Sequence, residues 1–276
     1  MSKQFAKPLA LFVAAIAAIA LAAPVAQAAT PAPGYGQFAG CPSPAESPEA
    51  SDCIRSVTTG GHFQMGSKDV PITNPITLTG GFNPAPGKGQ VSFSPKGGLA
   101  PVKQTVPGGV IGLTGLDWLV NFLNVEQLKL YAVTELAGVP VINFGTLEVS
   151  LPIKVHLVNT VLGNSCYVGS ASNPIKLNLI IGTTNPPPPN KPITGKEPVL
   201  TFTESPEIFH VNGGVFVDNS FAAPGASGCV LTLLGFIPIS LNGLVNSQAG
   251  LPSAAGHNET IQNVDQELAI QTTVYP

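Results

Sequence analysis

The residue types that could do chemistry concentrate in one stretch, residues 151–177 (LPIKVHLVNTVLGNSCYVGSASNPIKL), which holds His156, Cys166, Tyr167 and several serines. A histidine near a cysteine or serine could serve a nucleophilic enzyme, because the imidazole takes the proton of the attacking thiol or hydroxyl. The same stretch also fits two strands joined by a turn, with Cys166 in a disulfide. His156 falls beside Lys154 on the polar side of an alternating pattern, which favours a solvated strand position over a catalytic base.

The other three histidines show no local pattern of a metal or catalytic site. His210 lies in EIFHV with a parity opposite to its apolar neighbours, so we expect it on a polar face. His62 and His257 stand beside glycine or asparagine in apparent loops. No two histidines lie within four residues of each other, so the short ligand spacing of a zinc-binding helix is missing. We therefore expect no metal and no cofactor.

A secreted hydrolase is the enzymatic alternative. The chain has no Gly-x-Ser-x-Gly pentapeptide, and its nearest match, GASGC at residues 225–229, runs into a cysteine. Glu204 and Glu207 could pair as acid and base, but two solvated carboxylates at a turn marked by proline are the simpler interpretation. No catalytic residue is assigned, and a hydrolytic site assembled by the fold from distant residues stays open.

The N-terminus predicts export. Lys3 and Lys7 precede an uncharged run over residues 8–23, and the small residues that follow predict signal cleavage after Ala28. Sixteen helical residues span only about 24 Å, which is short of a bilayer core of roughly 30 Å. We expect a secreted, extracellular or envelope-associated protein without a transmembrane segment after cleavage. A lipobox ending at Cys41 is the rival interpretation, but it lies too far beyond the apolar run.

Charge and composition limit the partners. Removing Lys3 and Lys7 with the signal leaves ten of the 12 basic residues against 15 acidic ones, a formal charge of −5. Nucleic acid is therefore not expected as a partner. Only 10% of residues are charged and 44% are hydrophobic, with 30 glycines and 28 prolines, which indicates many turns around a large apolar core.

The four cysteines predict two disulfides in an oxidising compartment. Three pairings are possible. Because closing a short loop costs the least entropy, we favour Cys41 with Cys53 and Cys166 with Cys229. Each bridge is expected to add about 2 to 4 kcal/mol by restricting the unfolded chain.

Most elements that must position these residues are short strands. Residues 29–52 are expected to form a flexible leader rich in Pro, Ser and Ala, and residues 53–276 a single β-rich domain. The clearest strand is LEVSLPIKVHLV, where apolar residues alternate from Leu147 to Leu157. Pro152 inside it predicts an edge position or a bulge, because proline donates no ladder hydrogen bond. A stiff extended connector is expected at TTNPPPPNKP.

Only two helices are expected, one in LTGLDWLVNFLN and one around residues 240–249, stopped by Gly250. The fold class is therefore all-β, an antiparallel β-sandwich or partly open barrel with one or two short helices.

The most unusual feature is residues 219–258, which contain no Asp, Glu, Lys or Arg. One interpretation is a strand and a helix buried in the core. The other is an apolar surface or cavity that meets envelope lipid or another apolar partner. The candidate residues for that surface come from this run and from the first expected helix: Trp118, Phe122, Leu233, Leu234, Phe236, Ile237 and Ile239.

Several stretches resemble a group of exported actinobacterial proteins of unassigned function. They are LPIKVHLVNTVLGNSCYVGSASNPIKLNL, GTTNPPPPNKPITG, VDNSFAAPGASGC and LVNSQAGLPSAAGHN, and the resemblance extends from about Cys53 to Asn258. It implies secretion and a shared fold, and no reaction. The leading hypothesis is a secreted or envelope-associated, non-enzymatic β protein with a binding or structural role. The alternatives are the hydrolase and a carrier of an apolar molecule, which needs a pocket of some hundreds of Å³.

Overall fold

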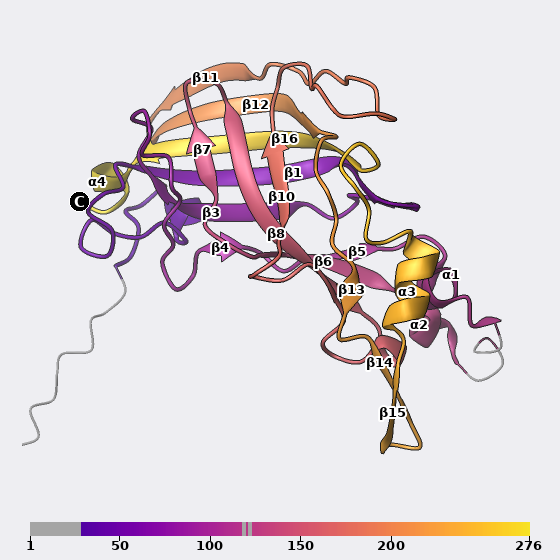
Figure 1. The fold of residues 1–276 in the computed structure, drawn as a ribbon. Helices are drawn as coiled ribbons and strands as arrows, with labels where there is room; N and C mark the ends of the chain where they lie inside the picture. The colour runs from indigo at the N-terminus through magenta and orange to yellow at the C-terminus, as the bar shows by residue number, and fades with distance from the viewer. Residues whose placement is uncertain (1–28, 118–119, 121–122) are drawn as a thin grey trace, which may run out of the picture.

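The computed structural model describes residues 29–117, 120 and 123–276. These residues form mostly antiparallel strands, arranged in two sheets and a separate two-stranded ribbon (Figure 1). The predicted all-β fold with a few short helices is confirmed, in its sandwich form.

The first sheet has seven strands and contains both ends of the β-rich region. Its central pair joins β1 to β16 in antiparallel register, with Asp52 opposite Ile270 and Gln64 opposite Glu259. In order across the sheet the strands are β11 (Val199–Glu204), β12 (Glu207–Asp218), β16 (Glu259–Ile270), β1 (Asp52–Met65), β3 (Ile76–Phe82) and β4 (Gly98–Leu99), with β2 (Lys68–Pro71) also paired to β1.

The second sheet also has seven strands and is built around β8 (Glu148–Val158). Its order is β13 (Ala226–Ser227), β9 (Tyr167–Val168), β8, β6 (Tyr131–Leu136) and β5 (Lys103–Thr105), with β10 (Ile175–Leu179) and β7 (Val141–Asn143) also paired to β8. The ribbon consists of β14 (Val230–Leu233) and β15 (Ile237–Ser240). The helices within the described residues include η1 (Gly36–Phe38), α1 (Gly109–Thr114), α2 (Val125–Leu128), η3 (Thr160–Leu162), α3 (Asn242–Ala249) and α4 (Gln271–Val274).

The core lies between the two sheets, where β8 crosses in front of the strands of the first sheet in Figure 1. Ile153 and Val155 of β8 belong to one buried cluster with Phe216 of β12 and Val264 of β16. At one side the sheets are joined directly, since the N–H of Val217 donates to the carbonyl of Ile180 at 2.8 Å and the carbonyl of Val217 accepts the N–H of Ile180 at 3.0 Å. The sandwich is therefore closed along this side by main-chain contacts.

The alternation predicted for β8 is confirmed, but the place of Pro152 is not. Ile153, Val155 and Leu157 are buried and their neighbours are not. Pro152 lies opposite Lys176 of β10 in a regular ladder, inside the sheet. On the other side of β8, β6 pairs only as far as Ile153 and β7 begins at Ser150. Pro152 therefore faces the gap between two ladders, where no strand needs its missing N–H.

Two segments expected to be loose or extended are packed. The polyproline run turns back on itself, because the N–H of Thr184 donates to the carbonyl of Ile193 at 2.8 Å. Its tip is held by Asn190, whose Nδ2 donates to the carbonyl of Asn258 at 2.8 Å. Gly256 lies directly beneath, with a φ of +86° and too little space for a Cβ against the carbonyl of Pro187. The run is a loop fixed by hydrogen bonds at its base and its tip, and the prediction of an extended connector is wrong.

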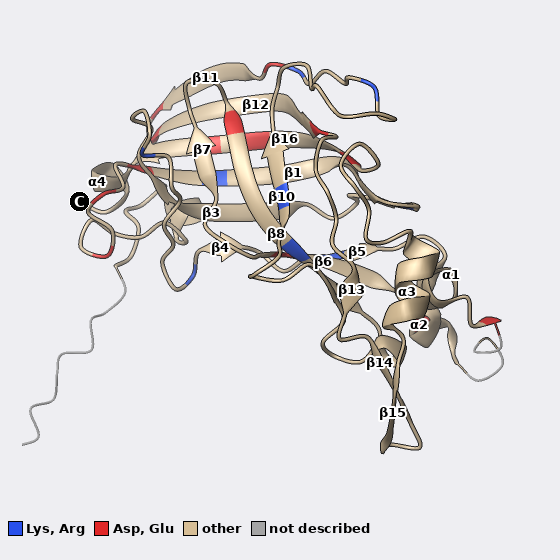
Figure 2. Ribbon diagram, viewed as in Figure 1, with Lys and Arg blue, Asp and Glu red and all other residues tan. Residues whose placement is uncertain are grey.

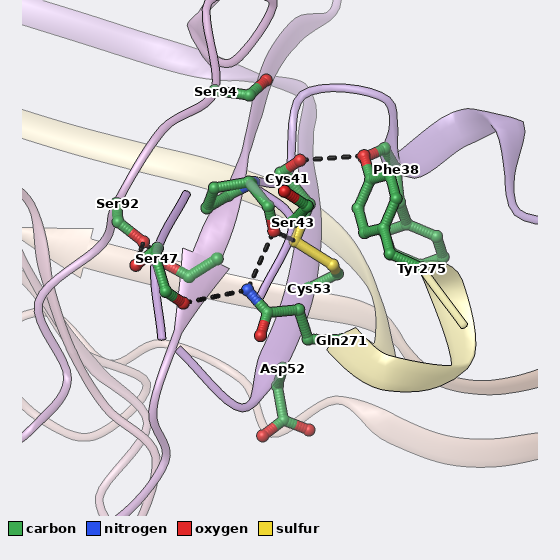
Figure 3. Close-up of a disulfide and its surroundings, with 12 residues drawn as sticks. Phe38, Cys41, Ser43, Ser47, Asp52, Cys53, Ser92, Ser94, Gln271 and Tyr275 are labelled. Atoms are coloured by element: carbon green, nitrogen blue, oxygen red, sulfur yellow. Dashed lines mark hydrogen bonds between the residues drawn. A yellow bond between two sulfur atoms is a disulfide. The ribbon is translucent and has the colours of Figure 1, made fainter. Parts of the chain in front are cut away.

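Residues 29–52, expected to be a flexible leader, instead pack onto the end of the first sheet. Phe38 is completely buried and Tyr35 nearly so, in a cluster that includes Tyr275 from the other end of the chain. The Tyr275 hydroxyl donates to the carbonyl of Cys41 at 2.9 Å (Figure 3). The Gln271 Nε2 donates to the carbonyl of Pro42 at 2.8 Å. Two aromatic residues, which sequence inspection passed over among the prolines, give this segment its own small core.

The second predicted helix is confirmed as α3, which ends where Gly250 takes a φ of +65°. The first predicted helix, residues 113–124, includes residues 118, 119, 121 and 122, which lie outside the described residues. Helix α1 overlaps only its beginning and ends at Thr114, because Gly115 adopts a left-handed φ of +69°. Trp118 and Phe122 lie outside the described residues.

Candidate functional site

All four cysteines are used in disulfides, in the predicted pairing. Cys41 bonds Cys53 and Cys166 bonds Cys229, and no free cysteine remains. Figure 3 shows the first bridge between the N-terminal segment and the start of β1. The second bridge ties β9 to the base of the ribbon. The sulfurs therefore supply cross-links, and the thiol chemistry considered for residues 151–177 has no thiol to use.

His156 occupies the expected solvent face of β8. It stacks on Tyr167 with ring centroids 4.4 Å apart, and its Nδ1 lies 3.6 Å from a Glu135 oxygen. The Lys154 ammonium lies over the Tyr167 ring, 4.5 Å from its centroid, in a cation–π contact. His156 and Tyr167 of residues 151–177 therefore belong to a surface cluster of stacked and paired side chains.

The closest arrangement to a catalytic triad lies on the outer face of the first sheet. The Thr203 hydroxyl is 2.9 Å from His210 Nε2, and His210 Nδ1 is 3.8 Å from Glu267 Oε1. Glu267 is also paired with Arg55 at 3.1 Å, which ties the carboxylate to a neighbouring strand. Thr203 and His210 line none of the five main pockets in the described part of the chain. The three groups form a surface row across adjacent strands, outside these pockets.

The remaining candidates for acid–base chemistry are also on the surface. Glu204 and Glu207 face each other across the turn that joins β11 to β12, and both are exposed. His62 lies 2.8 Å from Asp69 on the adjacent strand, and His257 is exposed in a loop. Over residues 29–117, 120 and 123–276, no group of three His, Cys, Asp or Glu side chains could hold a metal ion.

The five apolar candidates that the structure describes meet on the ribbon. Leu233 and Ile237 face each other across it, and Ile239 lies opposite Leu231, so these four side chains share one face. The turn between the strands carries Leu234 and Phe236, which are 83% and 73% exposed. Leu233, Ile237 and Ile239 are between 37% and 42% exposed. These five apolar side chains therefore lie on the surface of the ribbon and not in the core.

The core interpretation holds for the helix that follows. Leu241, Val245 and Ala249 of α3 and its flank are buried in the main core. The Asn246 side chain pairs with both backbone groups of Ala226, at 2.6 Å to the N–H and 3.1 Å to the carbonyl. One uncharged run thus supplies a buried helix and an exposed ribbon.

The base of the ribbon is fixed to the body of the molecule. Cys229, which precedes β14, is bonded to Cys166 and completely buried. Its N–H donates to the Asn242 side chain at 2.8 Å, and its carbonyl accepts the N–H of Leu241 at 2.8 Å. The ribbon is held on both strands at its root, and its tip projects away from the sheets (Figure 1).

The end of the molecule that carries the ribbon is largely uncharged. Figure 2 shows β14, β15 and α3 without Lys, Arg, Asp or Glu, whereas the first sheet carries charges of both signs. Further apolar side chains are exposed at this end: Val120, Val125 of α2 and Leu244 of α3. We call this region, defined by Leu233, Leu234, Phe236, Ile237, Ile239 and Leu244, the apolar end.

The cavities inside the sandwich are small. The two between the sheets measure about 60 and 70 Å³, and the one bordered by α3 about 30 Å³. Pockets that bind small molecules are typically roughly 300 to 1,000 Å³. None of these three cavities reaches the size expected for the carrier pocket, whose predicted lining by residues 219–251 and the helix around Trp118 falls partly outside the described residues.

A larger open groove lies at the opposite end of the first sheet. It measures about 420 Å³ and is lined mainly by aromatic and aliphatic side chains: Phe82, Pro84, Phe144, Phe202, Phe209, Leu268, Ala269 and Ile270, with Asp52 and Glu207. Sequence analysis missed this groove. Phe202 and Phe209 stand out as alternating apolar residues in two adjacent strands, but their assembly with Phe144 depends on the packing of two sheets.

Within the described residues, no helix has the length and hydropathy needed to cross a membrane. Comparisons with protein-family models, with curated proteins and with solved structures find no match for this chain.

Proposed function

We propose that the protein is an exported, envelope-associated, non-enzymatic binding protein that attaches to a lipid surface through its apolar end. The observation that carries the proposal is the ribbon turn, where Leu234 and Phe236 are exposed on a rigidly anchored projection. Two disulfides are compatible with an extracellular location. The proposal includes export of the chain and its resemblance to exported actinobacterial proteins, which implies a shared fold.

The backbone at Leu234 supports a functional role for its side chain. Leu234 has a φ of +53° and Gly235 a φ of +79°, and the N–H of Phe236 donates to the carbonyl of Leu233. Hairpin turns with two left-handed residues strongly favour Asn-Gly or Asp-Gly. A leucine in this conformation costs on the order of 1 kcal/mol. The chain thus keeps an exposed apolar side chain at a position where asparagine would fold more easily.

The size of the apolar surface suits reversible attachment. Burying each large apolar side chain contributes roughly 1.5 to 3 kcal/mol, so Leu234 and Phe236 together supply about 3 to 6 kcal/mol. The face with Leu233, Ile237 and Ile239 extends the contact. Main-chain groups along the ribbon are costly to place in hydrocarbon, so only the tip and this face are expected to enter the lipid interface.

The absence of charge favours lipid over a protein partner. Protein interfaces surround an apolar centre with a polar rim, and arginine is enriched in them. The ribbon has Thr232, Pro238 and Ser240 on its less apolar strand face, and no charged residue on either face. Without lysine or arginine, attachment should depend on apolar burial and not on anionic headgroups.

The test measures binding of the exported chain to vesicles of neutral phosphatidylcholine, using Leu234→Asn as the variant. Asparagine suits the left-handed turn, so the fold should be kept or slightly stabilised while vesicle affinity falls about tenfold or more. Leu200→Asn is the matched control, because Leu200 is 57% exposed on β11, far from the ribbon. Equal binding by wild type and Leu234→Asn, or an equal loss in Leu200→Asn, would contradict the proposal.

A further inference from the structure

We propose that β11 and the aromatic groove beside it bind an extended, basic segment of another protein, which adds a strand to the free edge of the first sheet. This inference is independent of the ribbon. It rests on the open edge, on the exposed apolar row beneath it and on the carboxylates at its rim.

Strand β11 is the outermost strand of the first sheet, paired only with β12. All six of its residues are exposed. Glu204 and Glu207 face each other across a two-residue turn and form the first hydrogen-bonded pair, and such pairs alternate along an antiparallel ladder. Val199, Thr201 and Thr203 therefore direct their backbone N–H and C=O groups away from β12, toward an incoming strand.

On the inner face of the first sheet, side chains of neighbouring strands form rows that run across the strands. Along each row the side chains change from exposed at β11 to buried at the central strands. Phe202 is opposite Phe209, Phe209 is opposite Leu268, and Leu268 is opposite Ile54. Exposure falls along this row from 58% at Phe202 to 1% at Ile54. The next row repeats the trend, because Leu200 is 57% exposed and its partner Val211 is 1% exposed. The second sheet covers only the inner part of each row.

The groove lies where this cover stops. Phe144, in the turn between β7 and β8, approaches Phe82 with ring centroids 6.4 Å apart and forms one wall. Phe202 and Phe209 form the other. An added strand beside β11 would place every second side chain on this inner face, next to Leu200 and Phe202. The groove of about 420 Å³ is large enough to take one aromatic or large aliphatic side chain from that strand.

Charge selects the class of partner. The groove is lined by the carboxylates Asp52 and Glu207, and Glu204 stands opposite Glu207 at the end of β11. Glu197 adds a fourth carboxylate before the strand, whereas Lys196 is the basic residue beside it. Two copies of this edge would bring acidic surfaces together, which disfavours self-pairing. An extended segment with apolar residues and lysine or arginine is attracted by the same charges.

Prolines mark how far the added strand can pair. Pro198 precedes β11 and Pro206 follows it in the turn. Because proline lacks an N–H and interrupts a ladder, pairing is confined to the residues between them. Edge strands are commonly protected against pairing with another chain along their whole length. In β11 the prolines that block such pairing lie only at its two ends. The open interval is suited to a short peptide.

The probe is a blocked seven-residue peptide that alternates valine, threonine and phenylalanine between two terminal lysines. Its binding to the exported chain is measured by isothermal titration calorimetry, beside a peptide with glutamates in place of the lysines. The lysine peptide is expected to bind at least about tenfold more tightly. Thr201→Pro removes an outward N–H at an edge position that tolerates proline and should weaken binding about tenfold or more.

Thr201→Val is the matched control, because it changes the same side chain and keeps the N–H. It should bind the lysine peptide like wild type. Circular dichroism and a thermal melt confirm that both variants stay folded. Absence of binding by either peptide, equal binding of both peptides, or unchanged binding in Thr201→Pro would overturn the proposal. A dimer in light scattering that Thr201→Pro dissociates would assign the edge to a second copy and would also overturn it.

Discussion

At the scale of single residues, the chain buries the carboxylate of Asp218 and exposes the leucine side chain of Leu234, the reverse of their usual preferences. Asp218 is 3% exposed at the end of β12. Its two oxygens accept the N–H of Asn178 at 2.7 Å and the N–H of Ser220 at 2.8 Å. The carboxylate thereby links β10 of the second sheet to β12 of the first. Burial raises the pKa of this carboxyl, although the two hydrogen bonds act in the opposite direction.

This raised pKa predicts a pH dependence with a defined sign. In the unfolded chain Asp218 loses its proton near its ordinary pKa, whereas the folded protein holds the proton to higher pH. The stability that Asp218 contributes is therefore greatest below the ordinary aspartate pKa and falls as pH rises above it. The difference in unfolding free energy between wild type and Asp218→Asn should be larger at low pH than at neutral pH. Urea denaturation at several pH values measures it, and a difference that grows with pH would contradict the assignment.

At the scale of elements, a short two-stranded ribbon and one edge strand carry the proposed functions. The ribbon β14–β15 is fixed at its root by a disulfide. Strand β11 is the edge strand of a seven-stranded sheet and is paired on one side only. Both are exposed because the neighbouring sheet does not reach them. The central strands β1, β8 and β16 are covered and serve to hold these margins in place.

The two disulfides should differ in their contribution to stability. Cys41–Cys53 joins residues 12 apart, and Cys166–Cys229 joins residues 63 apart. Since the entropy lost by the unfolded chain grows with the logarithm of loop length, the longer bridge should stabilise by about 1.4 kcal/mol more. Urea denaturation of the two paired Cys→Ala variants tests this. An equal or larger loss on removing Cys41–Cys53 would show that the packing around Tyr275 outweighs loop entropy.

At the scale of the whole molecule, the two proposed contacts lie at opposite ends. The ribbon projects from one end, and β11 and the groove lie at the other, on the far side of the core (Figure 1). A protein attached to lipid by the ribbon would present the open sheet edge away from the lipid. This arrangement suits a scaffold that holds an extended segment of another protein near the envelope.

Salt should separate the two contacts. Vesicle binding through the apolar end has no charged residue to screen, so it should be equal within error at about 0.05 M and about 0.5 M NaCl. Peptide binding at the groove depends on Asp52, Glu204 and Glu207 and should weaken at the higher salt. Both are measured on the same preparation. A strong loss of vesicle binding with salt would place the lipid contact on a charged surface.

The sequence by itself determined the features that depend on the local pattern of residue types along the chain. Alternation in β8, the stop of α3 at Gly250, the disulfide pairing and the uncharged character of residues 219–258 all follow from neighbours in the chain. Tertiary structure alone decided which apolar residues are covered. Ile153 and Phe202 both belong to alternating strands, yet one is buried and the other open, because coverage depends on whether the opposite sheet extends that far. Pro152 and Phe38 show the same limit, since each owes its place to segments distant in sequence, and no local pattern records where those segments pack.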